Sequence, residues 1–305
     1  MQLQQLRYFD TVVGEKSMNK AAEKLFVSQP SLSKSIASLE KELGTRLFYR
    51  TSRGVELTDH GKKLHEYARV VLKQVELIYG LKSEEQVQVL TVSAYPCMIN
   101  GVILSRFYQR LDRHAEISMK ECRIEEAMDN VDHMISEFAI IQVKQVQKKE
   151  VEKALQKKNL EYHELAVDDI CINVGPGSPH YGKKSIHIQE LLGDMVIRMQ
   201  DDYFSNLCYF LDIDDAKFVD IEKTMFVNDG QMMIQVLRNT EAFRVSMKLE
   251  SQVMHDYGID TIPLEGGEGN ISIGWIQRKN THISEYGLEF LREVQQYVDM
   301  HKSYN

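Results

Sequence analysis

The chain has 305 residues, which suits two or three domains and leaves enough sequence to bury a core without disulfide or metal support. Its 43% hydrophobic and 27% charged residues are typical of a folded globular protein and exclude a collagen-like or low-complexity chain. The formal net charge is −8, yet residues 1–75 carry 13 Lys and Arg against 8 Asp and Glu. A basic N-terminal segment on an acidic body predicts a nucleic-acid-binding module joined to a unit with another task.

Hydropathy gives no sign of a membrane-spanning segment. No stretch approaches the roughly 18 apolar residues that a span needs, and the start, MQLQQLRYFD, lacks the pattern of a secretory signal. We therefore expect a cytoplasmic protein with no membrane partner.

Common catalytic and metal-binding motifs are absent from the sequence, including HExxH, GxSxG and the P-loop. The cysteines have no CxxC spacing and are expected to be structural thiols, with oxidation sensing by Cys208 as an alternative. They are Cys97, Cys122, Cys171 and Cys208. We expect no enzymatic activity, metal or cofactor. The rival hypothesis is a solute-binding or enzymatic α/β protein whose N-terminal helices only dimerise it.

Three helices are predicted at the N-terminus. Apolar residues recur at three- and four-residue steps from Leu3 to a helix end near Gly14. Ser17 can cap a short second helix, and Ser28 can cap a third helix from about Gln29 to Leu43. A tight turn between the second and third helices predicts a helix-turn-helix, whose second helix lies in the major groove of DNA.

The exposed face of the third helix carries an amide, short hydroxyls and one cation. Gln29 can pair with adenine, and Lys34 can reach guanine or phosphate. The alternative is an ordinary solvated helix face. The following segment, LFYRTSRGVELT at 47–58, favours DNA binding because it predicts a two-stranded wing with Arg46, Arg50 and Arg53 along it.

Several residues of this segment stand at the spacings of a known family: Ser17, Ala21, Ala22, Leu25, SQPSLS at 28–33, Ile36, Leu39, Glu40, Leu43, Gly44, Leu47, Phe48, Arg50, Arg53, Leu57, Thr58 and Gly61. In these positions the sequence resembles the LysR-type transcriptional regulators. The resemblance implies a winged helix-turn-helix in which Arg53 enters the minor groove. The candidate DNA-contacting residues are Ser28, Gln29, Pro30, Ser31, Ser33, Lys34, Arg50 and Arg53. The implied partners are a double-stranded DNA operator, a small-molecule effector and RNA polymerase.

A long helix is predicted next, because apolar or small residues alternate steps of four and three from Leu57 to Ile78. The predicted seam is Leu57, Gly61, Leu64, Ala68, Val71, Val75 and Ile78. Such a seam can pair with a second copy or fold back on its own domain. The resemblance favours a homodimer through this linker helix, within a homotetramer, and a two-fold protein recognises a palindromic operator. Residues 82–88 are the expected hinge.

Strands and helices alternate from residue 87 to the C-terminus, which predicts parallel sheets covered by helices. The predicted strands are 87–94, 116–122, 138–143, 168–175, 194–199, 242–246 and 271–277; the predicted helices are 99–111, 125–135, 188–193, 229–239 and 284–298. This part resembles the two-subdomain α/β effector domain of the same family, which is similar to type 2 periplasmic binding proteins. The overall class is therefore α/β.

Three regions follow from these predictions. Residues 1–58 form the DNA-binding domain, 59–87 the linker helix and hinge, and 88–305 the effector-binding regulatory domain. Within the last region, subdomain I spans about 88–158 and 269–305, and subdomain II spans about 160–268.

An effector site is expected between the two subdomains, because open α/β sheets bind ligands at the carboxyl ends of their strands. The loop after the first strand runs from Tyr95 to Asn100, and the resemblance implies that it holds the effector. Where many family members place Ser or Thr for a carboxylate, this chain has Cys97 and Met98. Arg198 can supply a cation, or can instead pair with a surface or interdomain carboxylate. The candidate residues are Tyr95, Cys97, Met98, Asn100, Arg198, Gln200 and Tyr203.

Overall fold

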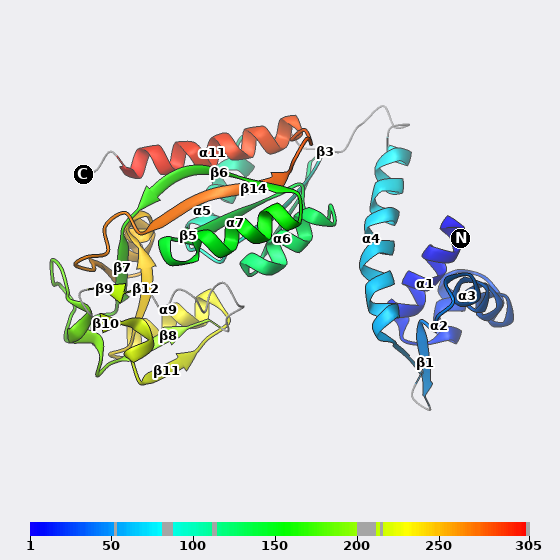
Figure 1. Ribbon diagram of the computed structural model, residues 1–305, viewed down its shortest axis with the longest axis horizontal. Helices are drawn as coiled ribbons and strands as arrows, with labels where there is room; N and C mark the ends of the chain where they lie inside the picture. Colours follow the sequence, from blue (N-terminus) through cyan, green and yellow to red (C-terminus); the bar gives the residue numbers. More distant parts are fainter. Residues whose placement is uncertain (52–53, 81–87, 112–114, 200–211, 214–215, 303–305) are drawn as a thin grey trace. The chain divides into compact units, whose positions relative to one another are not determined.

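The computed structural model describes residues 1–51, 54–80, 88–111, 115–199, 212–213 and 216–302. The chain divides into two compact units, Met1–Val87 and Gln88–Asn305, each of which is described by itself (Figure 1). Arg53, Gln200, Tyr203 and Cys208 lie outside the described residues.

The N-terminal unit is a helical domain with a two-stranded wing and a long C-terminal helix (Figure 1). Its elements are α1 (Leu3–Glu15), α2 (Met18–Lys24), α3 (Gln29–Leu43), β1 (Phe48–Thr51), β2 (Gly54–Leu57) and α4 (Asp59–Gly80). The predicted caps are confirmed: Ser17 Oγ accepts from the Lys20 N–H at 3.4 Å, and Ser28 Oγ accepts from the Ser31 N–H at 3.3 Å. Gly44 ends α3 at a φ of 68°, in the left-handed region.

Aromatic and branched side chains from all these elements fill the core of this unit. Phe9 of α1 packs 5.1 Å, ring centroid to ring centroid, from Phe48 of β1, and both are buried. Leu32 and Leu39 place the inner face of α3 against them. This packing leaves the opposite, polar face of α3 in solvent.

Helix α4 begins on the wing and then packs on α1. A Cβ at Gly61 would lie 2.2 Å from the Leu47 carbonyl oxygen, so only glycine allows the helix to approach the wing this closely. Ala68 is 1% exposed, and Leu64 and Leu72 pack on the core of the same unit. The first half of the predicted seam is therefore used within the domain, as the fold-back alternative expected.

The C-terminal unit contains two five-stranded sheets. The first has the order β4-β3-β5-β14-β6 and comprises β3 (Gln88–Ala94), β4 (Ala115–Glu121), β5 (Phe138–Lys144), β6 (Leu160–Asp168) and β14 (Ile271–Arg278). Its helices are α5 (Ile99–Tyr108), α6 (Ile124–Asp132), α7 (Lys148–Lys157) and α11 (Glu285–Lys302). Helices α5 and α11 share one buried cluster with the sheet, and α6 and α7 share another. The sheet is therefore covered on both faces.

The second sheet has the order β11-β8-β12-β7-β13. Its strands are β7 (Ile170–Val174), β8 (Met195–Arg198), β11 (Lys223–Phe226), β12 (Phe243–Met247) and β13 (Asp260–Pro263), with helices α9 (Gly230–Asn239) and α10 (Ser251–Asp256). Short elements complete the unit: the 3₁₀ helices η1 (Gln145–Gln147), η2 (Ile188–Leu191), η4 (Phe218–Asp220) and η5 (Lys248–Glu250), and the two-residue strands β9 (Asp212–Ile213) and β10 (Ala216–Lys217).

The predicted parallel pairing is confirmed for part of each sheet and is wrong for the rest. Strands β3, β4 and β5 are parallel, as are β8, β11 and β12, but β14 runs antiparallel to β5 and β6, and β7 runs antiparallel to β12 and β13. The chain passes from one sheet to the other after β6 and returns before β14. A strand that arrives from the other sheet needs no crossover helix, so it is free to run antiparallel to its neighbours.

The division between the predicted subdomains also differs. The sequence predicts that residues 160–168 belong to the second subdomain, but as β6 they pair with β14 in the first sheet, with Asp168 opposite Ile271. The crossover therefore lies at Asp168 and Asp169, about one strand later than predicted. The predicted helix at 188–193 is only the 3₁₀ turn η2, and β11, β13 and α10 were not predicted.

Candidate functional site

The start of α3 presents an exposed polar surface. Ser28, Gln29, Pro30, Ser31 and Lys34 are all exposed, and Ser33 is half-buried. Gln29 Nε2 donates to Ser33 Oγ at 2.8 Å, and the hydroxyls of Ser28 and Ser31 lie 2.8 Å apart. These contacts hold the amide and the hydroxyls in an ordered row on the helix. Such a row can donate to and accept from the edges of base pairs.

The predicted wing is present and follows α3 in the sequence. Strands β1 and β2 pair antiparallel, with Phe48 opposite Leu57, and Arg46 just before β1 is exposed. The backbone of Arg50 lies in β1, while its side chain and the whole of Arg53 are outside the described residues.

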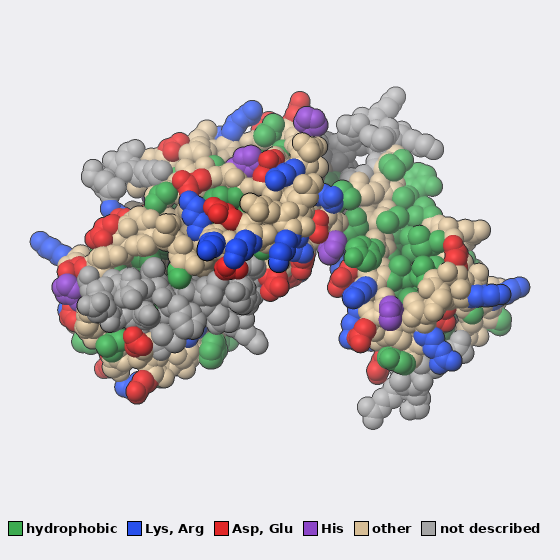
Figure 2. All heavy atoms as spheres, viewed as in Figure 1, with side chains coloured by type: hydrophobic (Ala, Val, Ile, Leu, Met, Phe, Trp, Pro, Cys, Tyr) green, Lys and Arg blue, Asp and Glu red, His purple; other side chains and the backbone are tan. Residues whose placement is uncertain are grey.

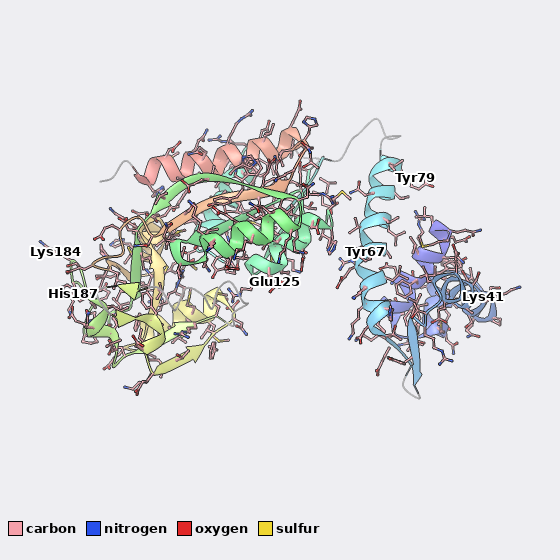
Figure 3. All side chains as sticks on the ribbon, viewed as in Figure 1. Lys41, Tyr67, Tyr79, Glu125, Lys184 and His187 are labelled. Carbon is pink, nitrogen blue, oxygen red and sulfur yellow. The ribbon has the colours of Figure 1, made fainter. Side chains whose placement is uncertain are left out.

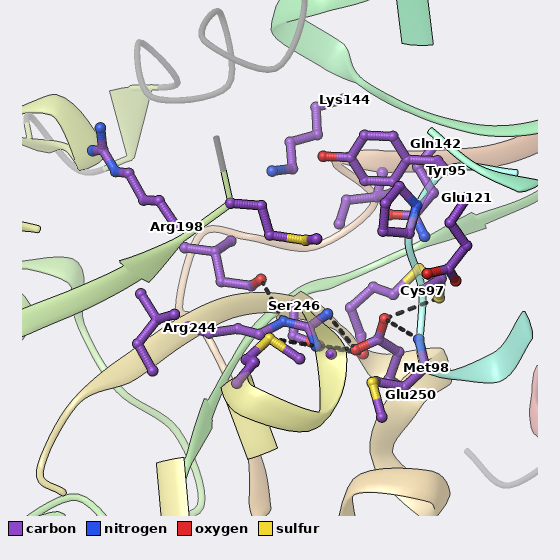
Figure 4. Close-up of a pocket in the computed structure, with 18 of the residues that line it drawn as sticks. Tyr95, Cys97, Met98, Glu121, Gln142, Lys144, Arg198, Arg244, Ser246 and Glu250 are labelled. Carbon is purple, nitrogen blue, oxygen red and sulfur yellow. Dashed lines mark hydrogen bonds and ion pairs between the residues drawn. The ribbon is translucent and has the colours of Figure 1, made fainter. Parts of the chain in front are cut away.

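A pocket in the C-terminal unit is lined by residues of both sheets (Figure 4). Tyr95, Cys97 and Met98 come from the loop between β3 and α5, and Arg198 from the end of β8. These four predicted effector residues are therefore brought together. Asn100 is buried away from the pocket, where Nδ2 donates to the Tyr95 carbonyl at 3.0 Å and to Glu121 Oε1 at 2.7 Å. These hydrogen bonds hold the loop in place, and Asn100 itself does not line the pocket.

Arg198 lines the pocket, and its Nη2 donates to the Phe218 carbonyl oxygen at 3.1 Å. Its guanidinium points away from the centre of the pocket (Figure 4). The cation that does lie deep in the pocket is Arg244 on β12, which sequence reasoning missed.

Arg244 forms a buried ion pair with Glu250, with Nη2 and Oε2 2.6 Å apart. The Glu250 side chain is 1% exposed and also accepts from Ser246 Oγ, Cys97 Sγ and the Met98 N–H. Burial opposes ionisation of this carboxyl, but Arg244 and the other donors outweigh burial and hold the Glu250 pKa below its ordinary value. The pocket therefore has an ionised carboxylate at its base.

The sequence of β12 contains a pattern that indicates the ion pair between Arg244 and Glu250. Arg244 and Ser246 are two residues apart and so share one face of a strand that is otherwise apolar. A cation on a buried strand needs a partner nearby. Gln142, Lys144 and Glu121 also line the pocket and were not predicted, because none belongs to a motif.

The three cysteines that the structure describes are buried and reduced. Desolvation raises the pKa of the Cys171 thiol to about 12 and also raises the pKa of Cys97 and Cys122. A thiol with a raised pKa is a poor nucleophile. Within the described ranges, no cluster of His, Cys, Asp and Glu has the geometry of a metal site, and no helix is long and apolar enough to cross a membrane.

The N-terminal unit is thus a winged helix-turn-helix, and the C-terminal unit is a two-subdomain α/β unit with an internal cleft. Residues 3–62 match the family model described as the bacterial regulatory helix-turn-helix protein of the lysR family. The chain is 46% identical over 76 residues to the nitrogen assimilation regulatory protein nac of Escherichia coli (strain K12), which covers 25% of each chain. It is 47% identical over 81 residues to the regulator BenM of Acinetobacter baylyi (strain ATCC 33305 / BD413 / ADP1), covering 27% of each.

These alignments span about a quarter of the length of the curated relatives. The fold is similar along nearly the whole chain to CbnR, a LysR family transcriptional regulator, with a TM-score of 0.66, 18% identity, and coverage of 97% of this chain and 99% of CbnR. Full-length BenM gives a TM-score of 0.51 at 20% identity, covering 98% of this chain and 97% of BenM. The comparisons therefore show a helix-turn-helix of the lysR family at residues 3–62 and, along nearly the whole chain, the fold of CbnR and BenM.

Proposed function

We propose that this chain is a transcriptional regulator that binds a palindromic DNA operator and responds to a small-molecule effector. The observation that carries the proposal is the exposed row of Ser28, Gln29, Ser31 and Lys34 at the start of α3, in a unit that also has a two-stranded wing. Phosphate contacts from the wing position such a helix, and contacts from its polar face select the base sequence. A solved structure of full-length CbnR, similar in fold, contains that protein's target DNA.

The second half of α4 supports dimerisation. Val71 and Ile78 are 41% and 60% exposed, although both belong to the predicted apolar seam. Hydrophobic side chains gather along this helix in Figure 2, and Tyr67 and Tyr79 project from it in Figure 3. We propose that this half pairs with a second copy, that two dimers form a tetramer, and that RNA polymerase is a further partner in the cytoplasm.

The proposed mechanism is a shift between two closures of the C-terminal unit. An effector bound in the cleft favours the closure for which it has the higher affinity, and only that difference in affinity can change the population. The change would reach the DNA-binding domains through the α4 helices.

Operator recognition is tested by selecting bound sequences from random duplexes with the full-length chain, followed by gel shifts at several salt concentrations. We expect an enriched inverted repeat whose affinity falls as salt rises. Gln29→Ala should lower the discrimination between the operator and a base-substituted duplex by about 1–3 kcal/mol. Gln4→Ala, at an exposed position of α1, is the matched control and should leave discrimination unchanged. Absence of any enriched sequence would defeat the proposal.

A further inference from the structure

Glu250 uses its full capacity to accept hydrogen bonds. Oε1 accepts from Cys97 Sγ at 2.9 Å and from the Met98 N–H at 3.3 Å. Oε2 accepts from Arg244 Nη2 at 2.6 Å and from Ser246 Oγ at 2.8 Å. An ionised carboxylate has about four acceptor positions, and here all four are filled by protein donors.

The four donors come from opposite walls of the cleft. Cys97 and Met98 precede α5, which covers the first sheet, whereas Arg244 and Ser246 lie on β12 of the second sheet. Glu250 ends η5, also on the second side. Its carboxylate therefore joins the two subdomains at the base of the pocket, as the dashed lines in Figure 4 show.

This donor set has the chemistry of a receptor for a free carboxylate. A guanidinium, a hydroxyl and a backbone N–H at the start of a helix are the groups that recognise small anions in proteins. All of them are enclosed: the Arg244 side chain is 13% exposed, and Ser246 is buried. A buried guanidinium without an anion would be strongly destabilising, so this site requires a negative charge at all times.

We propose that Glu250 is a tethered anion that permanently occupies a carboxylate-binding site, excludes free carboxylate ligands from it, and holds the two walls of the cleft together. This inference rests on the proposed role of the cleft as the effector site. It follows that the effector is recognised at the outer part of the pocket and needs no carboxylate seated against Cys97 and Met98.

The size of the side chain suggests a direct test by chemical rescue. Glu250→Ala removes a CH₂–COO⁻ group, which is the size of acetate, and leaves the four donors in place. The full-length wild-type chain, Glu250→Ala and Glu250→Gln are compared by thermal unfolding in sodium acetate and in sodium chloride at equal ionic strength.

Wild type should show no difference between the two salts. Glu250→Ala should melt lower than wild type in chloride and gain about 3 °C or more in acetate, with saturation, since a ligand that binds only the folded state stabilises it. Glu250→Gln loses the charge, so it should also melt lower than wild type, but it keeps the site filled and should show no acetate effect. An equal response of wild type and Glu250→Ala to acetate would overturn the proposal.

A chain that does not fold when Glu250 is replaced is also informative. If Glu250→Ala is recovered folded only from cells or buffers that contain acetate, the site is a carboxylate receptor. If it fails to fold with acetate present while Glu250→Gln folds, the site does not accept a free anion and the proposal is wrong. None of these readouts requires DNA, so a failure of rescue leaves operator binding intact, and a failure of operator binding leaves the rescue intact.

Discussion

Phe26 lies in the turn between α2 and α3 with a φ of 55° and an exposed fraction of 97%. Its N–H donates to the Glu23 carbonyl, and the Val27 N–H donates to the Ala22 carbonyl, so Phe26 takes the position after a helix where glycine or asparagine is usual. The left-handed conformation destabilises the folded state by about 1–2 kcal/mol for a bulky residue. A solvent-exposed ring makes few packing contacts that could offset this cost.

Phe26→Asn should therefore raise the free energy of unfolding by about 1 kcal/mol, because asparagine tolerates this conformation. Urea unfolding of the full chain measures the change. Phe26→Ala is the matched control, since it removes the ring but keeps a side chain that disfavours the conformation. If both variants gain the same stability, the exposed ring and not the backbone is the source of the strain.

Asp168 has a pKa raised above its ordinary value, chiefly because burial disfavours the ionised carboxylate. The folded state then binds a proton more tightly than the unfolded state, so stability falls as pH rises from the unfolded pKa to the folded pKa. Asp168→Asn keeps an acceptor for the Leu249 N–H, which Asp168 Oδ2 binds at 2.8 Å, and removes the buried charge.

We expect Asp168→Asn to melt higher than wild type at neutral pH and to match it below pH 3.8, where both carry an uncharged side chain. Thermal unfolding across this pH range measures the difference. A gain that is the same at every pH would show that ionisation of Asp168 is not its cause.

At the scale of single residues, the sequence was more informative about the exposed polar face of α3 than about the cleft. The polar face of α3 follows from periodicity, since Leu32, Ile36 and Leu39 must face the core. The ion pair between Arg244 and Glu250 depends instead on how two sheets meet. Glu250 also accepts a hydrogen bond from Cys97, which is 153 positions away in the chain. A contact over that distance leaves no pattern in the local sequence.

Helix α4 serves two purposes along its length. Leu64 and Ala68 pack on the core of the N-terminal unit, whereas Val71 and Ile78 remain in solvent. An exposed apolar stripe that continues a buried one is typical of a helix that packs on its own domain first and on a second copy afterwards.

Ile78→Asp should shift the full-length chain from dimer or tetramer towards monomer, because it places a charge in the proposed interface. Sedimentation velocity over a range of concentrations measures the assembly. His60→Asp adds a charge at an exposed position near the start of the same helix and should leave the assembly unchanged. An oligomer that survives Ile78→Asp at all concentrations would contradict pairing through α4.

The elements that sequence reasoning missed share a physical cause. Strand β6 is an edge strand, and in LEYHELAVD only Leu160 and Ala166 are buried, so its hydrophobic pattern is weak. Strands β11 and β13 are also at sheet edges and have four residues each. Central strands such as β5 and β7, which are almost entirely buried, were predicted close to their observed ends.

On the scale of the whole molecule, charge is divided between the two units. Residues 1–75 carry more basic than acidic side chains, with Lys34 in α3 and Arg46 beside the wing, whereas residues 76–305 carry an excess of acidic side chains. If only the N-terminal unit contacts the duplex, the salt dependence of the binding affinity should depend on the Lys and Arg residues of that unit alone.

Lys34→Gln should reduce the slope of log affinity against log salt by about 0.9, the loss of one phosphate contact. Lys149→Gln, at an exposed position on α7, removes the same charge from the C-terminal unit and should leave the slope unchanged. Fluorescence anisotropy with a labelled operator measures both slopes. An equal decrease for the two variants would show that the C-terminal unit also contacts DNA.

The pairing of β6 with β14 has a consequence for how this chain could be rebuilt. Asp168 and Ile271 are direct neighbours in an antiparallel ladder, although about one hundred residues separate them. Residues 169–270 are therefore an insertion whose two ends emerge side by side. Replacing them with a two-residue hairpin turn would join β6 to β14 without moving either strand, and a different ligand-binding module could be spliced in at the same point.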